Sequence, residues 1–378
     1  MASTSDSSRP ARLGVRAALV DGEHVPGDVL VADGRIAAVG VAPAGGRGLA
    51  VPGYLDLHIN GIAGVDFLTT DPDGYRHSGA TLAQTGVTGY LPTFITAPLS
   101  DVSGALAVVA AFQDRDDAVT GARLLGVHLE GPYLSPRWPG AHDPDHLRSP
   151  DVDEMLGLVA GGPVRMVTLA PELPGALDVI AALVERGIVV SCGHSDADAA
   201  QAAAAFDAGA RAITHIYNAH RRWAPRDPGI GGVALIRPGI TVQAIVDHIH
   251  LAPEAAYGAF LASGPRFSLV TDAMAAAGQG DGTYHMGRRT VEVRDGRAQL
   301  HEGRLAGSVL TMDVAVRNLV GCGATVAAAV HAATAAPARL LGRSDLGVLR
   351  PGGRADITVL DDDLRVVRTV VGGAEAFG

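Results

Sequence analysis

The sequence contains no lysine, so all 30 of its basic side chains are arginine. Schiff-base catalysis on a lysine amine is therefore excluded, and so is a carbamylated lysine bridging two metal ions. If the chain binds a metal, carboxylate and imidazole side chains must coordinate it.

Cysteine is scarce as well. Cys192 and Cys322 are the only two cysteines, which excludes a disulfide framework and a thiolate zinc cluster. No apolar run approaches the roughly 20 residues needed to span a membrane. The net charge of −10 argues against nucleic acid as a partner. Residues 1–10 lack the apolar centre of a signal peptide, which predicts a disordered N-terminus on a cytoplasmic protein.

The central motif is the apolar stretch 124–132, LLGVHLEGP. It is typical of one strand buried on both faces, stopped by a glycine and a proline. Glu130 then lies at the C-terminal end of a parallel strand, where α/β barrels place their chemistry. Two later stretches end in the same way at His194 and His215. Three strand ends thus bring a carboxylate and two imidazoles to one rim, which predicts a metal site.

A repeating βα pattern runs between about residues 51 and 343. Eight candidate strands end near His58, Thr93, Glu130, Leu169, His194, His215, Asp247 and Asp272. Helical patterns cover 74–86, 101–117, 151–160, 175–186, 196–208, 253–263 and 308–320, with Ser100 and Ser195 as candidate caps. Eight such units predict an α/β fold of the (β/α)₈ TIM-barrel type.

The two ends of the chain have a different character. Residues 11–51 and 345–378 read as short strands with Gly and Asp turns, which predicts one small β-sandwich domain built from both chain ends. The barrel then occupies residues 52–344. Within it, segment 283–303 predicts a hairpin with an Asp295–Gly296 turn.

Asp272 ends the eighth predicted strand, in LVTDA. An aspartate there is equally typical of a helix cap. Facing a metal, it becomes the natural general base, because a water attacking an amide must lose a proton and the departing amine must gain one.

A series of motifs in order carries a family resemblance. They are PGYLDLHINGIAGVDF (52–67), GVHLEGPYLSP (126–136), PGAHDP (139–144), GHSDA (193–197), THIYNA (214–219), RDPG (226–229), LVTDAM (269–274) and LAGSVLTM (305–312). Together they resemble the N-acetylglucosamine-6-phosphate deacetylases of the amidohydrolase superfamily, over almost the whole chain.

The resemblance implies a barrel with a β-sandwich, in a homodimer, and a role for each matching residue. It implies metal ligands at Glu130, His194 and His215, and an acid/base at Asp272. His142 would polarise the acetyl carbonyl. The implied contacts to the sugar and its acetyl group are Ala141, His142, Asn218, Ala219, Leu305, Ala306 and Gly307. Arg226 and His250 match the residues that grip the phosphate, a task that suits the planar guanidinium fork.

Three departures from the family pattern qualify this picture. The first strand has His58 and Asn60 where many amidohydrolases have two histidines, so a second metal has little support. His220 replaces the usual methionine and His248 replaces the usual glycine. His58, Asn60, His220 and His248 are candidates for a second metal or for further substrate contacts, and the last two either reflect drift or alter the sugar preference.

The expected reaction is therefore hydrolysis of the acetamide of N-acetylglucosamine 6-phosphate, with one divalent ion, Zn²⁺ or Fe²⁺, as cofactor. Two alternatives stay open. The substrate can be a related amino-sugar phosphate such as N-acetylgalactosamine 6-phosphate, or the chain can be a sugar-phosphate-binding relative that has lost catalysis. Intact Glu130, His194, His215 and Asp272 argue against the inactive alternative.

Overall fold

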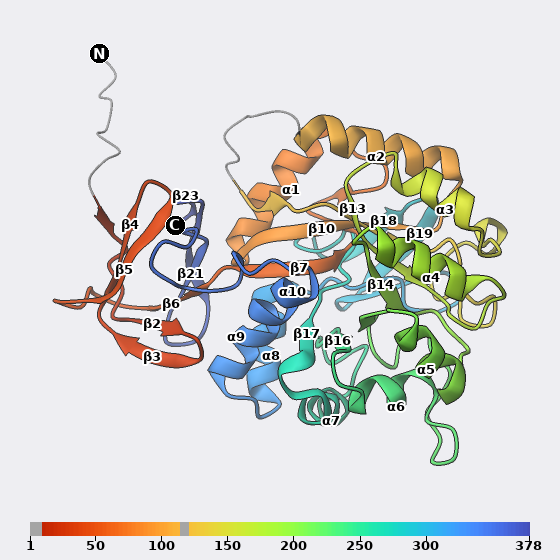
Figure 1. The fold of residues 1–378 in the computed structure, drawn as a ribbon. Coiled ribbons are helices and arrows are strands. Elements are labelled where there is room, and N and C mark those ends of the chain that lie inside the picture. Colours follow the sequence, from red (N-terminus) through yellow and green to blue (C-terminus); the bar gives the residue numbers. More distant parts are fainter. Residues whose placement is uncertain (1–9, 114–120) are drawn as a thin grey trace.

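The computed structural model describes residues 10–113 and 121–378, so the predicted disordered N-terminus lies almost wholly outside the described residues. Figure 1 shows two parts side by side, a barrel wrapped by helices on the right and a smaller all-β part on the left. Both described ends of the chain lie in the β part. Within the described residues, no helix is both long and apolar enough to cross a membrane.

Eight parallel strands form the barrel, as the sequence predicted. In spatial order they are β7 (Tyr54–Ile59), β10 (Val87–Ile95), β12 (Val127–Glu130), β13 (Val164–Leu169), β14 (Val189–Cys192), β15 (Ala212–Ile213), β16 (Thr241–Ala244) and β17 (Phe267–Leu269). A parallel bridge between Ile59 and Ala273 joins the last strand segment back to the first. The ring of strands therefore brings all C-terminal strand ends to one rim.

The stretch around Glu130 is not one strand, contrary to the sequence-based prediction. It is divided into β11 (Arg123–Leu124) and β12, and both pair with β10. Gly126 lies between them with a φ of +142°, a conformation that few residues other than glycine adopt. The break leaves Glu130 in place as the last residue of β12.

Helices cover the outside of the barrel (Figure 1), and the main core lies between them and the strands. Seven follow the predicted ranges: α1 (Pro72–Gln84), α2 (Leu99–Gln113), α3 (Val152–Val159), α4 (Ala176–Glu185), α5 (Ala199–Asp207), α7 (Pro253–Ser263) and α8 (Met312–Gly321). The last part of the helix predicted at 101–117, residues 114–117, lies outside the described residues. The sequence did not predict α6 (Gly229–Ile236), α9 (Val326–Ala333) or α10 (Ala335–Leu340).

Physical reasons explain these differences. The sequence of α6, GIGGVALI, is rich in glycine, which disfavours an isolated helix, and α6 forms where it packs against α5. Neither serine predicted as a cap has that role. Asp198 caps α5 in a capping box with Gln201, and Ser100 lies inside α2.

The smaller part contains two sheets. The three-stranded sheet has the order β1 (Ala11–Arg12), β4 (Asp28–Ala32), β5 (Arg35–Val41). The six-stranded sheet has the order β23 (Ala374–Phe377), β22 (Val366–Val371), β21 (Ile357–Leu360), β6 (Leu49–Pro52), β2 (Ala17–Val20), β3 (Glu23–Pro26). Because β21 pairs antiparallel with β6, strands from both ends of the chain share one sheet, next to the start of the barrel.

The predicted hairpin is confirmed and gains a third strand. Strands β18 (Gly282–Met286), β19 (Arg289–Arg294) and β20 (Arg297–Gln299) form an antiparallel sheet. At the turn between the last two, Asp295 and Gly296 both have positive φ, at 49° and 71°. This is the turn geometry that Asp-Gly favours, because its twist matches that of the flanking strands. A short pair, β8 (Gly61–Ile62) and β9 (Val65–Asp66), completes the strands.

Candidate metal centre and substrate cavity

Four side chains that can bind a metal ion or accept a proton lie at the rim where the barrel strands end. Glu130 is the last residue of β12, and His194 and His215 each follow their strands by two residues. Asp272 follows β17 by three residues, and its backbone N–H donates to the carbonyl oxygen of His58 at 2.8 Å. The strand ends therefore deliver all four residues to one place, as the sequence predicted.

Three of these residues have an unusual backbone. His194, His215 and Asp272 have φ values of 48°, 29° and 47°, in the left-handed region that residues with a side chain seldom adopt. Such conformations cost of order 1–3 kcal/mol each and persist where the surrounding structure enforces them. Their concentration at one rim indicates a functional site.

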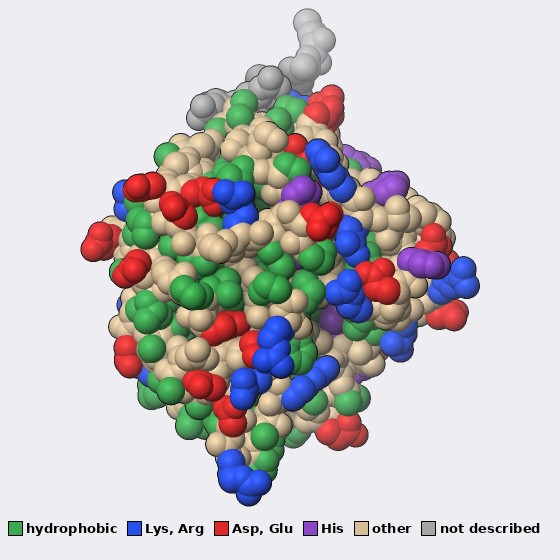
Figure 2. All heavy atoms as spheres, turned by 90° about the vertical axis from the view of Figure 1, so that its right-hand side faces the viewer, with side chains coloured by type: hydrophobic (Ala, Val, Ile, Leu, Met, Phe, Trp, Pro, Cys, Tyr) green, Lys and Arg blue, Asp and Glu red, His purple; other side chains and the backbone are tan. Residues whose placement is uncertain are grey.

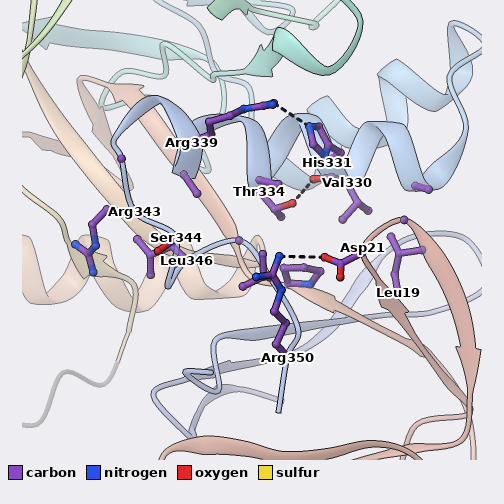
Figure 3. Close-up of a pocket in the computed structure, with 18 residues that line it drawn as sticks. Leu19, Asp21, Val330, His331, Thr334, Arg339, Arg343, Ser344, Leu346 and Arg350 are labelled. Carbon is purple, nitrogen blue, oxygen red and sulfur yellow. Dashed lines mark hydrogen bonds and ion pairs between the residues drawn. The ribbon is translucent and has the colours of Figure 1, made fainter. Parts of the chain in front are cut away.

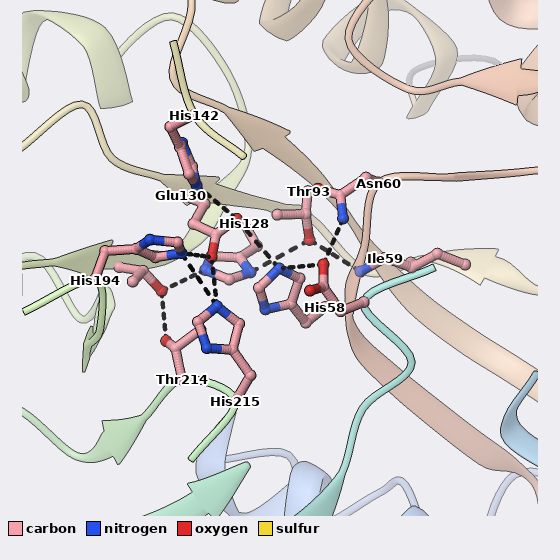
Figure 4. Close-up of polar contacts among 12 residues, drawn as sticks. His58, Ile59, Asn60, Thr93, His128, Glu130, His142, His194, Thr214 and His215 are labelled. Carbon is pink, nitrogen blue, oxygen red and sulfur yellow. Dashed lines mark hydrogen bonds and ion pairs between the residues drawn. The ribbon is translucent and has the colours of Figure 1, made fainter. Parts of the chain in front are cut away.

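The side chains of Glu130, His194 and His215 point toward one another (Figure 4). The Nε2 atoms of His194 and His215 each lie 3.1 Å from Oε1 of Glu130, and 3.2 Å from each other. All three residues are buried. Their ligand atoms all lie within 4.8 Å of one another, which is close enough to hold one ion. Among the described residues, this is the group of three or more His, Cys, Asp or Glu side chains that meets this condition.

The position of the proton on His194 indicates that a cation binds between Glu130 and the two histidines. Nδ1 of His194 lies 2.9 Å from the carbonyl oxygen of Trp138, which only accepts hydrogen bonds, so Nδ1 carries the proton of the neutral ring. The Nε2 lone pair of His194 then faces the carboxylate oxygen of Glu130. Two acceptors this close repel one another unless a cation lies between them.

A divalent metal fits the donor set. Ligand atoms about 2.0–2.1 Å from a tetrahedral ion are about 3.3 Å apart, close to the separations of the Glu130, His194 and His215 atoms. The bond from His194 to the Trp138 carbonyl is the outer contact that orients a ligating imidazole. The buried His/Glu group is thus able to bind one metal ion.

The electrostatics favour the protonation states that metal ligands need. Burial opposes ionisation of Glu130, but the neighbouring imidazoles, with His58 contributing most and His142 donating a hydrogen bond, outweigh it and hold the pKa of Glu130 well below its usual range. Burial lowers the pKa of His215, and the neighbouring His194 lowers it further against the opposing effect of Glu130. Glu130 is therefore anionic and His215 neutral.

Asp272 is held beside the cluster by two residues of the first strand region. The amide Nδ2 of Asn60 donates to Oδ1 of Asp272 at 2.6 Å, and Nε2 of His58 lies 3.2 Å from the same oxygen. Burial favours the neutral acid, but His58 outweighs it and lowers the pKa of Asp272. Asp272 is therefore an ionised carboxylate with access to the cavity.

His58 also approaches the metal cluster. Its Nε2 lies 3.4 Å from Oε2 of Glu130, so it stands between two carboxylates. Asn60 gives its amide N–H to Asp272, which leaves only the carboxamide oxygen as a ligand atom. A second metal site involving His58 and Asn60 stays a prediction.

His142 presents an N–H group toward the cluster. The backbone N–H of Thr96 donates to Nδ1 of His142 at 3.1 Å, so the proton of the neutral ring lies on Nε2. That Nε2 is 3.3 Å from Oε2 of Glu130. His142 is therefore a hydrogen-bond donor at the site. Its ring is oriented by Thr96, a residue that the sequence-based prediction did not include.

A cavity of about 410 Å³ opens beside the metal cluster. This is the size range of small-molecule sites. Its lining is Glu130, Arg137, Trp138, Pro139, Gly140, Ala141, His142, His194, His215, Asn218, Ala219, Arg222, His250, Asp272, Met286, Arg304, Leu305 and Gly307. Figure 2, which shows the molecule from the right-hand side of Figure 1, has basic and acidic side chains interspersed over this face.

Most of the predicted site residues line this cavity, including Asn218, Ala219, Leu305 and Gly307. His250 does too, and its Nδ1 lies 2.7 Å from Oδ2 of Asp247, which orients the ring. These placements agree with the predicted contacts, whose roles stay predictions.

Six predicted residues do not line the cavity, and two of them, His58 and Asn60, are described above. Arg226 is exposed on the loop before α6, and Ala306 is buried behind its neighbours. His248 is exposed outside the lining. His220 is buried against His215, and burial lowers its pKa well below the usual range. A neutral His220 adds no positive charge for a phosphate, so its role in substrate preference stays a prediction.

The cavity also contains residues that the sequence-based analysis missed. Trp138 donates its Nε1–H to Oδ1 of Asp196 at 2.8 Å, which fastens the loop ahead of His142. Gly140, with a φ of +56°, allows this loop to pass against His194, whose ring a Cβ would meet at 2.7 Å. Arg222 lines the cavity too, as do Arg137, Pro139, Met286 and Arg304. The available signals were the run RRW at 221–223 and the rarity of tryptophan, with two in the chain.

Asp56 adds a buried charge below the site. Its carboxylate accepts from Thr271 Oγ1 at 2.6 Å and from the backbone N–H of His58 at 3.2 Å. Burial nevertheless raises the pKa of Asp56 from 3.8 to about 6. The folded state therefore holds this proton more tightly than the unfolded chain does.

This shift predicts a pH-dependent stability. A raised pKa contributes stability below the unfolded value, and the contribution is lost as pH rises through the folded value. We expect the free energy of unfolding to fall by at most about 3 kcal/mol on this account between about pH 4 and pH 7. Asp56→Asn, which stays neutral, should flatten that decline in denaturant titrations. An identical slope in both proteins would contradict the assignment.

A second cavity of about 570 Å³ lies between the β part and the helices α9 and α10 (Figure 3). Its walls are mostly apolar, and its charged groups are engaged with protein partners. Arg350 is 3.4 Å from Asp21, Arg343 pairs with Asp345 at 2.7 Å, and Arg339 contacts His331. Its lining has no cluster of ligand atoms comparable to that around Glu130.

Comparison with known proteins agrees with this geometry. The amidohydrolase family model matches residues 49–376. The chain is 41% identical to human N-acetylglucosamine-6-phosphate deacetylase over 87% of this chain and 83% of the human protein. It is 39% identical to N-acetylgalactosamine-6-phosphate deacetylase of Escherichia coli O157:H7, over 91% of this chain and 93% of that protein.

A solved structure extends the similarity to the whole fold. An aspartate-to-alanine variant of the Mycobacterium smegmatis N-acetyl-D-glucosamine-6-phosphate deacetylase, in complex with N-acetyl-D-glucosamine-6-phosphate, superposes with a TM-score of 0.92. The two chains are 35% identical over 98% of this chain and 100% of the other. This chain therefore belongs to the amidohydrolase family, in the group that contains the N-acetylglucosamine-6-phosphate deacetylases.

Proposed function

We propose that this protein hydrolyses the acetamide of N-acetylglucosamine 6-phosphate to glucosamine 6-phosphate and acetate. The observation that carries the proposal is the buried group of Glu130, His194 and His215 beside the ionised Asp272, at the end of a cavity with arginines in its lining. Metal-assisted amide hydrolysis needs a metal position and a proton acceptor within reach of each other. The relatives named above supply the substrate class.

The three ligands would hold one divalent ion, which polarises a carbonyl and lowers the pKa of a water molecule when bound. Asp272 acts as the base and accepts a proton from the water that attacks the acetyl carbon. The Nε2–H of His142 donates to the oxyanion that develops on the former carbonyl oxygen.

The same carboxyl then completes the reaction. Protonated Asp272 returns its proton to the nitrogen as the C–N bond breaks, so a neutral amine and acetic acid are formed. The acid then gives up its proton in solution, where the amine accepts one, so the final products are the ammonium form of the amino sugar and acetate. Asn60 holds Oδ1 of Asp272 at 2.6 Å during both transfers. One water is consumed, and Asp272 ends ionised as it began.

A second sugar has a specific observation in its favour, the 39% identity to the Escherichia coli N-acetylgalactosamine-6-phosphate deacetylase. The test is acetate release from both sugar phosphates at matched concentrations. We expect kcat/KM to be higher for N-acetylglucosamine 6-phosphate. A preference for the galactose form would reassign the substrate and keep the mechanism, whereas no release from either would point to the inactive binder.

We also include in this proposal Zn²⁺ or Fe²⁺ as the ion, a homodimer and a cytoplasmic location. Two imidazoles and a carboxylate suit either ion. Elemental analysis of protein purified without added metal identifies the ion. Light scattering coupled to size-exclusion chromatography gives the number of chains in the assembly.

A further inference from the structure

The end of β13 lies at the same rim as the metal cluster, and Glu172 follows this strand by three residues, the spacing that Asp272 has after β17. The cavity lining, as far as the described residues define it, includes none of the residues from β13 to Glu172. The carboxylate of Glu172 instead accepts two hydrogen bonds from the segment after His194. Its Oε2 accepts from the hydroxyl of Ser195 at 2.8 Å, and its Oε1 accepts from the backbone N–H of Asp196 at 2.6 Å.

Asp196 extends these contacts to a second loop. Its Oδ1 accepts from the indole N–H of Trp138 at 2.8 Å, and its Oδ2 accepts from the guanidinium of Arg137 at 2.5 Å. The carbonyl oxygen of Trp138 in turn accepts from Nδ1 of His194 at 2.9 Å. A continuous path of hydrogen bonds therefore runs from Glu172 through Asp196 and Trp138 to the ring of a candidate metal ligand.

Ser195 gives Glu172 a second connection to the site. Ser195 is buried, its N–H donates to the carbonyl oxygen of Ala219 at 3.2 Å, and its carbonyl oxygen accepts from the N–H of Arg221 at 2.8 Å. Asn218 and Ala219 on that loop line the cavity. By holding the hydroxyl of Ser195, Glu172 fixes a residue that joins the loop after β14 to the loop after β15.

His194 depends on such outside support. Its φ of 48° is unfavourable for a residue with a side chain, so the surrounding contacts must hold it there. Hydrogen bonds to a carboxylate are roughly twice as strong as those between neutral groups. Outer partners of this kind set the orientation of a ligating imidazole and thereby its affinity for the ion.

We propose that Glu172 is a positioning residue for the metal centre, which acts through Asp196 and Trp138 on the ring of His194. The inference rests on the proposed function for the role of His194 as a metal ligand. Glu172 reaches the centre only through other residues, so its loss should weaken metal binding while the ligands themselves stay in the chain.

The test is the affinity for Zn²⁺, measured by competition with a chromogenic chelator. Glu172→Ala removes both acceptors, so the dissociation constant should rise by about 10- to 100-fold. Glu172→Gln should recover most of the affinity, because a carboxamide still accepts one hydrogen bond and donates another to a hydroxyl. A role in folding alone would lower the melting temperature of Glu172→Ala and leave its dissociation constant for Zn²⁺ unchanged.

A second variant follows the path one step further. Asp196→Ala leaves Glu172 its contacts with Ser195 and with the backbone, but it removes the acceptor of the Trp138 indole, so a similar loss of Zn²⁺ affinity is expected. In the double variant the two losses should not add, because both substitutions break one path. If Glu172→Ala does not fold, Asp196→Ala still tests the path.

The matched control is Glu185→Ala. Glu185 is an exposed carboxylate at the end of α4, outside the cavity lining, and its removal should leave the dissociation constant for Zn²⁺ unchanged. A loss of affinity in this variant equal to that of Glu172→Ala would mean that the effect reflects net charge, which would overturn the proposal.

A measurement on metal-free protein separates this inference from the proposed function. Trp138 and Trp223 are the two tryptophans, so Trp223→Phe isolates the fluorescence of Trp138. Adding Glu172→Ala should increase its quenching by acrylamide, because the loop that carries the indole loses its support. If quenching rises and Zn²⁺ affinity falls but the wild-type protein releases no acetate, the proposed function fails and the role of Glu172 stands. Equal Zn²⁺ affinity in wild type, Glu172→Ala and Asp196→Ala would overturn that role, whether or not acetate is released.

Discussion

Replacing Asp272 with asparagine is expected to lower acetate release by about 10²–10⁴-fold, the range typical of general acid–base catalysis. The amide has the shape of the carboxylate but does not accept the proton of the attacking water. Asparagine also tolerates the left-handed backbone at this position, where φ is 47°, so the fold should be preserved.

Two controls make this result specific to proton transfer. The metal content of the variant should equal that of the wild-type protein, because Asp272 is outside the group of Glu130, His194 and His215. Thermal denaturation should show a similar melting temperature. Turnover near the wild-type rate would assign the base to another residue.

The second large effect is expected from Glu130. Its Oε1 is shared by the two Nε2 atoms at 3.1 Å, so Glu130→Gln removes the only negative charge among the three ligands. We expect loss of the bound ion and a fall in acetate release of more than about 10³-fold, because carbonyl polarisation and water activation are lost together. Treatment of the wild-type protein with a chelator should have the same effect, reversed by adding the ion back.

His220→Met provides the matched control for this experiment. His220 is a buried imidazole whose ring centroid is 5.8 Å from that of His215, but its nitrogens are not part of the ligand group. Its replacement should leave one ion per chain. Unchanged metal content in Glu130→Gln, measured by elemental analysis, would refute the proposed metal centre.

The sequence by itself determined the parts of the molecule that depend on local patterns. Buried parallel strands are nearly continuous apolar runs, and their ends are marked by polar residues, glycine and proline. The eight barrel strands were therefore predictable, and so were Glu130, His194, His215 and Asp272 at their C-terminal ends. The Asp295–Gly296 turn was predictable for the same reason, since two adjacent residues define its conformation.

The tertiary structure decided what depends on residues far apart in the chain. The proton on His142 follows from the backbone of Thr96, and the proton on His194 follows from the carbonyl of Trp138, 56 residues away. Whether an arginine is free or paired depends in the same way on distant carboxylates, as Arg137 and Asp196 show.

The loop between His215 and α6 illustrates this difference most clearly. Its sequence offers Arg222 and Arg226 with no local pattern to distinguish them, and the family resemblance favours Arg226. Both arginines are exposed, but folding places the guanidinium of Arg222 over the ring of Trp138 in the cavity lining, whereas Arg226 lies outside that lining. A long charged side chain takes its direction from the surfaces that meet around it, and those surfaces exist only once the chain has folded.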